Sequence, residues 1–140
     1  MTFFYPTPRP TKLKIPLFAD KVPAGFPSPA ADYVSSRIDL NEYCISHPNA
    51  TYFLYATGDS MLEAGITEGS MLVVDRSINP AHGDIVIASI AGEFTVKRLC
   101  LHPRAQLEPM NPKYEPILLH DGGDDLEVMG VVVSSITRLK

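Results

Sequence analysis

The stretch Gly58-Asp59-Ser60-Met61 is the part of this 140-residue sequence on which the interpretation of the fold depends. Ser60 follows a Gly-Asp turn and precedes Met61, as a serine at the start of a short helical turn does. The backbone N–H groups of such a turn point toward incoming negative charge, as an oxyanion hole requires. We therefore predict that Ser60 is a nucleophile and that the N–H groups of Ser60 and Met61 form the oxyanion hole.

A second stretch, Glu93-Phe94-Thr95-Val96-Lys97-Arg98-Leu99, contains the base that such a nucleophile needs. Alternation along this β-rich run places Thr95 and Leu99 on the same face as Lys97, so the stem of the lysine enters a packed sheet. Burial favours the uncharged amine, and only an uncharged lysine can take the proton of a serine hydroxyl. Taken alone, the two stretches also fit a helix cap and a solvated lysine, both of which are common.

The order of motifs across residues 50–140 favours the catalytic interpretation. Between the two stretches lie Gly65-Ile66, Gly69-Ser70-Met71-Leu72-Val73-Val74-Asp75 and Gly83-Asp84-Ile85-Val86-Ile87-Ala88. In this order the motifs resemble the LexA/UmuD family of self-cleaving Ser-Lys peptidases. The resemblance implies a mainly β fold, with a compact, multi-stranded LexA-like peptidase domain and one short helix. It also implies that Ser60 and Lys97 form a catalytic dyad.

The first 30 residues differ from the rest because they hold seven of the 13 prolines. Proline fixes φ and donates no backbone hydrogen bond, so we expect an extended arm without a core of its own. We predict that residues 1–38 are this arm and its hinge, and that residues 39–140 are the β-rich peptidase domain. Within the arm, Ala24-Gly25 is similar to the bond that LexA-type proteins cut. Small side chains there let Ser60 approach the Ala24 carbonyl closely, although the arm also fits a plain linker.

Residues 39–140 show the pattern of one helix and a series of strands. Asp39 is typical of an N-cap, with Glu42 three residues later, and the helix is expected to end before His47-Pro48. Strands are expected over residues 51–56, 70–75, 84–89, 93–99, 106–110, 117–120 and 126–137. The last of these runs is expected at an edge of the sheet, where a second copy of the chain can pair with it.

Composition and charge limit the classes of partner. An apolar content of 45% is enough for one sizeable core. The net charge of −4 divides into +3 over the first 30 residues and −7 over the rest, so we expect no strong direct DNA binding. No apolar run has the length of a membrane span, and we expect a cytoplasmic protein without a membrane anchor.

The remaining chemistry-bearing residues predict no cofactor and no metal site. Cys44 and Cys100 follow no metal or redox spacing, and we expect both to be buried thiols in a reducing compartment. The acidic run 121–125 lacks the spacing of a calcium loop. The histidines lie in turns, at positions 47, 82, 102 and 120. His82 remains an alternative base for Ser60.

The resemblance to the LexA/UmuD family also implies a biological role. UmuD-type members are SOS mutagenesis proteins, whose self-cleavage is stimulated by RecA filaments on single-stranded DNA. The truncated homodimer joins UmuC as an accessory subunit of the error-prone translesion DNA polymerase V. The helix-turn-helix domain of the family's repressors does not fit the proline-broken residues before Gly25. Two alternatives stay open: a LexA-fold binding module that has lost catalysis, and a soluble Ser-Lys peptidase that cuts other proteins.

Overall fold

The computed structural model describes residues 2–18, 21–26, 34–119 and 126–140. His120, the acidic run 121–125 and, within the predicted arm and hinge, residues 1, 19–20 and 27–33 lie outside the described residues. The chain divides into two compact units, one made of Met1–Pro6 with His47–Lys140 and the other of Thr7–Ser46. The boundary between residues 38 and 39 stays a prediction.

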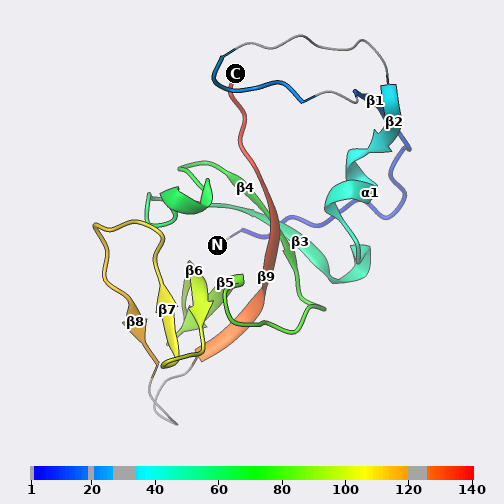
Figure 1. The fold of residues 1–140 in the computed structure, drawn as a ribbon. Helices are drawn as coiled ribbons and strands as arrows, with labels where there is room; N and C mark the ends of the chain where they lie inside the picture. Colours follow the sequence, from blue (N-terminus) through cyan, green and yellow to red (C-terminus); the bar gives the residue numbers. More distant parts are fainter. Residues whose placement is uncertain (1, 19–20, 27–33, 120–125) are drawn as a thin grey trace. The chain divides into compact units, whose positions relative to one another are not determined.

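The larger unit is built on one seven-stranded sheet in the order β3-β4-β9-β5-β6-β7-β8 (Figure 1). Its strands are β3 (Thr51–Tyr55), β4 (Met71–Asp75), β5 (Ile85–Ile90), β6 (Glu93–Cys100), β7 (Gln106–Glu108), β8 (Ile117–Leu118) and β9 (Leu126–Ile136). Every neighbouring pair is antiparallel. Each predicted strand is present, which confirms the mainly β fold.

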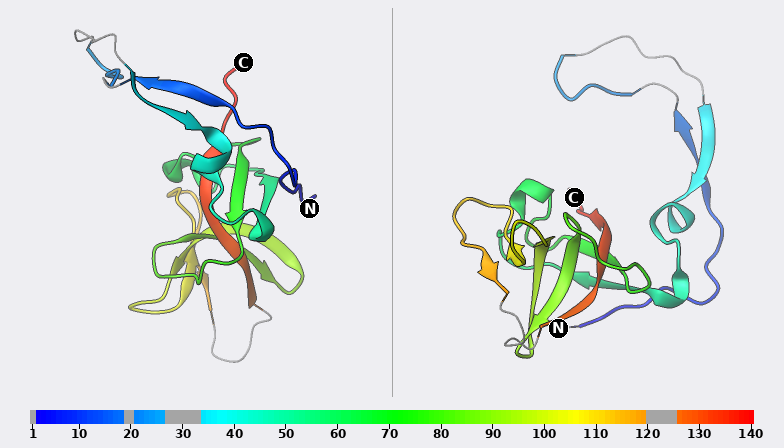
Figure 2. Two further views of the ribbon diagram at one scale, coloured as in Figure 1. Left: turned by 90° about the vertical axis from the view of Figure 1, so that its right-hand side faces the viewer. Right: turned by 60° about the horizontal axis from the view of Figure 1, so that its bottom comes forward.

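The last strand, β9, lies inside the sheet and not at its edge, so the expectation for residues 126–137 was wrong. It pairs with β4 on one side and β5 on the other. In Figure 2 this strand is the orange-to-red one, and it passes among the green strands of the sheet. Both pairings shift register, and Gly130 lies near these irregularities with φ 154°. A Cβ atom at Gly130 would lie 2.6 Å from a methyl carbon of Val74, so the glycine allows β9 and β4 to approach closely.

The core of this unit consists of two hydrophobic clusters. The first is made of Tyr52, Leu54, Ala56, Met61, Ile66, Leu72, Val74 and Ile87. The second is made of Val86, Ala88, Leu99, Leu107 and Val131. Met61 belongs to the first cluster, and burial of a side chain of its size stabilises a fold by about 1.5–3 kcal/mol. The residue next to Ser60 therefore anchors its turn to the core.

The smaller unit contains an antiparallel pair, β1 (Lys14–Phe18) with β2 (Val34–Asp39), and the helix α1 (Leu40–Cys44). All five residues of β1 are exposed. The prolines predict an extended arm here, but no sequence pattern indicated that β1 would pair with β2. Asp39 is the N-cap of α1, as predicted, and its carboxylate accepts hydrogen bonds from the N–H groups of Asn41 and Leu13 at 2.8 and 3.1 Å.

The two cysteines are both free thiols, but only one is buried as expected. Cys100 is buried and Cys44 is only half-buried. Burial raises the pKa of the Cys100 thiol. Within the described ranges, no helix has the length and apolar character needed to cross a membrane.

Candidate active site

Ser60 lies in the turn between β3 and the short 3-10 helix η2 (Leu62–Ala64). Gly58 has φ 82°, a left-handed conformation that favours glycine and lets the chain turn sharply before Ser60. The Ser60 carbonyl accepts a hydrogen bond of 2.8 Å from the Met110 N–H, and the Met110 carbonyl accepts one of 2.8 Å from the Glu63 N–H. The turn is therefore held by the residues after β7 as well as by Met61.

Lys97 extends from β6 to the same place. Its Nζ atom lies 3.2 Å from Ser60 Oγ, 2.7 Å from Thr95 Oγ1 and 3.1 Å from the Val96 carbonyl oxygen. The alternation that places Thr95 and Lys97 on one face explains why the hydroxyl reaches the amine. The structure thus brings together the two residues that the sequence analysis paired.

The electrostatic setting of Lys97 favours the neutral amine. Burial lowers the pKa of Lys97 below its ordinary value of 10.5. Among the described residues, no carboxylate lies within ion-pair distance of its Nζ atom. The three neighbours of Nζ are oxygen atoms of uncharged groups, so no opposite charge favours the ammonium form.

A cleft of about 260 Å³ opens at this pair of residues. Its walls are the end of β3, the turn that carries Ser60, and the first half of β6. Tyr55 and Phe94 lie on these walls, while Ser60 and Lys97 provide polar atoms. An extended peptide can reach the hydroxyl from the open side of such a cleft.

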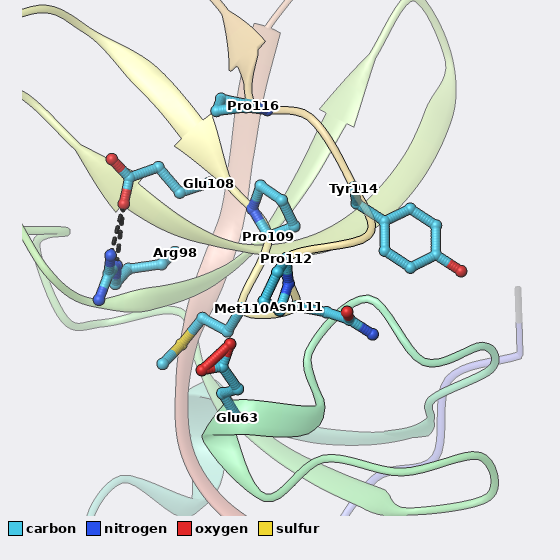
Figure 3. A pocket seen from close by; sticks show the side chains of 9 residues that line it. All are labelled: Glu63, Arg98, Glu108, Pro109, Met110, Asn111, Pro112, Tyr114 and Pro116. Atoms are coloured by element: carbon cyan, nitrogen blue, oxygen red, sulfur yellow. Dashed lines mark hydrogen bonds and ion pairs between the residues drawn. The ribbon is translucent and has the colours of Figure 1, made fainter.

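Two residues after β7 hold the backbone just before Ser60, and the sequence analysis missed both. The Asn111 side-chain amide donates a hydrogen bond of 2.8 Å to the Asp59 carbonyl, and the Tyr114 hydroxyl hydrogen-bonds to the Asp59 carboxylate. Figure 3 shows both side chains on the loop that borders a second cavity of about 280 Å³, together with the Arg98–Glu108 ion pair. Asn111 is 52 residues from Asp59, so no local pattern could have indicated the contact.

The other predicted site residues are placed as follows. The N–H groups of Ser60 and Met61 lie in the turn, and neither has a hydrogen-bond acceptor among the described residues. Ala24 and Gly25 belong to the smaller unit, where they are exposed in the connection from β1 to β2. A Cβ atom at Gly25 would meet no described atom within 4 Å.

His82, the alternative base for Ser60, does not line the cleft that holds Ser60 and Lys97. The ring of His82 stacks on that of His102 with a centroid distance of 3.8 Å, and its Nδ1 atom accepts a hydrogen bond from the Leu101 N–H. His47 pairs with Asp75 at 2.6 Å. In the part of the chain that the structure describes, the basic side chain that contacts Ser60 is that of Lys97. No group of three or more His, Cys, Asp or Glu side chains there could hold a metal ion.

A serine and a half-buried lysine in hydrogen-bond contact within a cleft of a β-rich domain define the class of Ser-Lys hydrolases. A family profile described as Peptidase S24-like matches residues 16–133, so the chain belongs to the peptidase S24 family and is a self-cleaving serine peptidase with a LexA-like fold. The resemblance that the sequence analysis found is confirmed.

The chain is similar to several curated proteins along most of its length. It is 54% identical to Protein ImpA of Escherichia coli over 125 residues, which are 89% of this chain and 85% of that protein. It is 48% identical to Protein SamA of Salmonella typhimurium over 96% of this chain and 94% of that protein. It is 47% identical to Protein MucA of Escherichia coli over 87% of this chain and 84% of that protein.

Proposed function

We propose that this chain cuts its own arm between Ala24 and Gly25, with Ser60 as the nucleophile and Lys97 as the general base. The observation that carries the proposal is the 3.2 Å contact between Lys97 Nζ and Ser60 Oγ inside an open cleft. Burial lowers the pKa of Lys97, which favours the neutral amine that a general base requires.

Lys97 Nζ has three oxygen neighbours, namely Thr95 Oγ1, the Val96 carbonyl oxygen and Ser60 Oγ. When the amine is neutral, its two N–H bonds can donate to the first two, and its lone pair can then accept the proton of the Ser60 hydroxyl. The Ser60 proton moves to Nζ as Ser60 Oγ attacks the carbonyl carbon of Ala24. The N–H groups of Ser60 and Met61 stabilise the oxyanion that forms.

The second half of the reaction returns the proton. The Lys97 ammonium donates it to the nitrogen of Gly25 as the Ala24–Gly25 bond breaks, and the arm remains as an ester on Ser60. Neutral Lys97 then activates a water molecule, which hydrolyses the ester and restores the Ser60 hydroxyl. The products are a carboxylate at Ala24 and a new amino terminus at Gly25.

The cut requires the arm to dock in the cleft in an extended conformation. Ala24 and Gly25 have small side chains and are exposed, so neither steric bulk nor local packing opposes docking. A partner that favours the docked conformation accelerates cleavage without supplying chemistry. We infer that a RecA filament on single-stranded DNA is such a partner.

The similarity to ImpA, SamA and MucA supports a role in SOS mutagenesis. We infer that the truncated chain forms a homodimer and joins UmuC as an accessory subunit of translesion DNA polymerase V in the cytoplasm. Because β9 lies inside the sheet, the dimer contact must use another surface than the one expected from residues 126–137. The acidic body makes strong direct contact with DNA unfavourable, so the nucleic-acid role acts through these partners.

The test is to incubate the purified chain with and without RecA filaments and to follow its intact mass. We expect one new N-terminus at Gly25, which Gly25→Lys blocks. Ser60→Ala and Lys97→Ala abolish the cut, whereas the matched control Lys113→Ala, on an exposed loop residue, leaves it unchanged. A dominant cut elsewhere, or a cut that survives Ser60→Ala, overturns the proposal.

The same assay separates the two alternative functions. A chain with the fold but no catalysis stays intact under every condition, including high pH. A peptidase that acts only on other proteins leaves its own arm uncut but cleaves an added unfolded protein, and Ser60→Ala abolishes that cleavage.

A further inference from the structure

The first residues of the chain form an isolated antiparallel β-bridge with the exposed edge of β3. Strand β3 is at one end of the sheet order, so one side of it has no neighbour from the seven strands. Phe4 occupies that side, where its N–H donates to the Phe53 carbonyl at 2.8 Å and its carbonyl accepts from the Phe53 N–H at 2.5 Å. Reciprocal backbone bonds of this kind define antiparallel pairing.

Aromatic contacts hold the same residues in place. The ring of Phe3 meets those of Tyr52 and Phe94 edge-to-face, with centroids 5.1 and 6.1 Å apart. The ring of Phe4 meets that of Tyr55 at 5.8 Å, again edge-to-face. Such geometry is the favoured one for aromatic pairs. Two adjacent phenylalanines therefore face opposite sides of the bridged segment and each finds an aromatic partner.

The surface that receives these residues also borders the active site. We define the β3 groove as the outer edge of β3 with the rings of Tyr52, Tyr55 and Phe94. Tyr55 and Phe94 line the cleft that holds Ser60 and Lys97, so the β3 groove and the cleft share two walls. A segment docked in the β3 groove thus contacts the two aromatic side chains that border the proposed substrate site.

The contact between Phe4 and Phe53 closes the chain between them into a loop. The smaller unit, Thr7–Ser46, is joined to the larger one at both ends, before Thr7 and after Ser46. Because Phe4 is paired with Phe53, the intervening residues form a loop closed at both ends. In such a loop the tail stays tethered near its groove, so its binding there is an intramolecular event.

We propose that the β3 groove is a docking site for an extended segment with two adjacent phenylalanines, and that its resident occupant is the chain's own tail, residues 2–5. A cut after Ala24, which rests on the proposed function, turns this intramolecular contact into a bimolecular one. After the cut, residues 1–24 are held by these contacts and by the exposed β1–β2 pair, and an isolated two-stranded pair is marginally stable in water, so the groove of the cut protein empties at micromolar concentration. Backbone pairing supplies attraction, and the aromatic pairs supply the preference for the two phenylalanines.

The first test measures amide hydrogen exchange by NMR in the full-length Ser60→Ala chain, which stays intact. The Phe53 amide, bonded to Phe4, is expected to exchange about tenfold or more faster in Phe3→Ser/Phe4→Ser. Amides of β4, which has strand neighbours on both sides, keep their exchange rates in this variant. Protection of Phe53 that is unchanged in the double variant overturns the docking site.

The second test cuts the loop without using the chain's own activity. A recognition site for an added protease replaces residues 21–24 in the Ser60→Ala chain, which is then cut and diluted to micromolar concentration. Phe53 is expected to lose its protection and to regain it with a millimolar peptide of residues 2–12, but not with the peptide that carries both serines. Protection that persists after the cut overturns the release. Because the protease is external, failure of self-cleavage does not affect this result.

Discussion

The side-chain amide of Asn111 donates a 2.8 Å hydrogen bond to the backbone carbonyl of Asp59, the residue before Ser60. Asn111 is 7% exposed, and its own carbonyl oxygen accepts a hydrogen bond of 3.0 Å from the Lys113 N–H. The amide is therefore fixed at both ends. The backbone just before Ser60 is therefore held by a loop that follows β7.

Asn111→Ala is expected to slow self-cleavage by roughly tenfold or more, because small displacements of a reacting atom are costly. The unpaired Asp59 carbonyl should also lower the free energy of unfolding by about 1–3 kcal/mol. The rate is measured by mass at a temperature at which urea titration shows the variant to be folded. Lys113→Ala is the control, since it keeps the backbone N–H that contacts Asn111. An unchanged rate in Asn111→Ala would show that the loop does not position Ser60.

The rate of self-cleavage is expected to rise with pH from neutrality. Burial lowers the pKa of Lys97 from 10.5, and only the neutral amine accepts the Ser60 proton, so the rate should level off below pH 10.5. A histidine base would instead give a plateau near its reference pKa of about 6.5. Such a plateau, with activity in Lys97→Ala, would contradict the assignment.

The lowered pKa of Lys97 also makes the stability of the folded chain depend on pH. Between the folded and unfolded pKa values of Lys97 the unfolded chain binds more protons, so stability increases with pH across that window. The cost of burying the ammonium is fully present below the folded pKa and disappears above 10.5. Lys97→Met, compared with the parent chain by urea unfolding at several pH values, should lack this increase.

Thr95→Val should move the midpoint of the pH–rate profile to lower pH. Thr95 Oγ1 lies 2.7 Å from Lys97 Nζ, and its loss removes one of the three oxygen atoms around the ammonium. The charged form loses more than the neutral form, so the pKa of Lys97 falls further. Thr95→Ser keeps the hydroxyl and should restore the parent profile. An identical midpoint in Thr95→Val would show that the hydroxyl does not influence the base.

Asp75→Asn should destabilise the larger unit by about 1–3 kcal/mol at neutral pH. Burial of Asp75 acts to raise its pKa, but hydrogen bonds from Ser77 and His47 outweigh it, so the pKa lies below 3.8. The contribution of this carboxylate is present above pH 3.8 and is lost as pH falls through the folded pKa. Urea unfolding should therefore show a difference from the parent chain that narrows in acid. Glu115→Gln, at an exposed loop position, is the control.

The amino-acid sequence by itself determined the local features of this protein. Asp39 caps a helix because its carboxylate binds N–H groups at the helix start, one of them only two residues away. Alternation in β6 placed Thr95 beside Lys97, since neighbours two apart share a face of a strand. The order of the motifs indicated the family, and with it the pairing of Ser60 and Lys97.

Only the tertiary structure decided which distant segments meet. The composition of residues 126–137 is that of a strand, whether the strand lies at an edge of the sheet or inside it. In the fold, β9 pairs with both β4 and β5 and so lies inside the sheet. Strand β7 ends at Glu108, because Pro109 has no N–H and the Met110 N–H donates to the Ser60 carbonyl instead. The periodicity of a sequence shows which face of a strand or helix is apolar. It does not show which other element packs against that face. For that reason Asn111 at Asp59 and Phe4 on β3 were visible only in the folded chain.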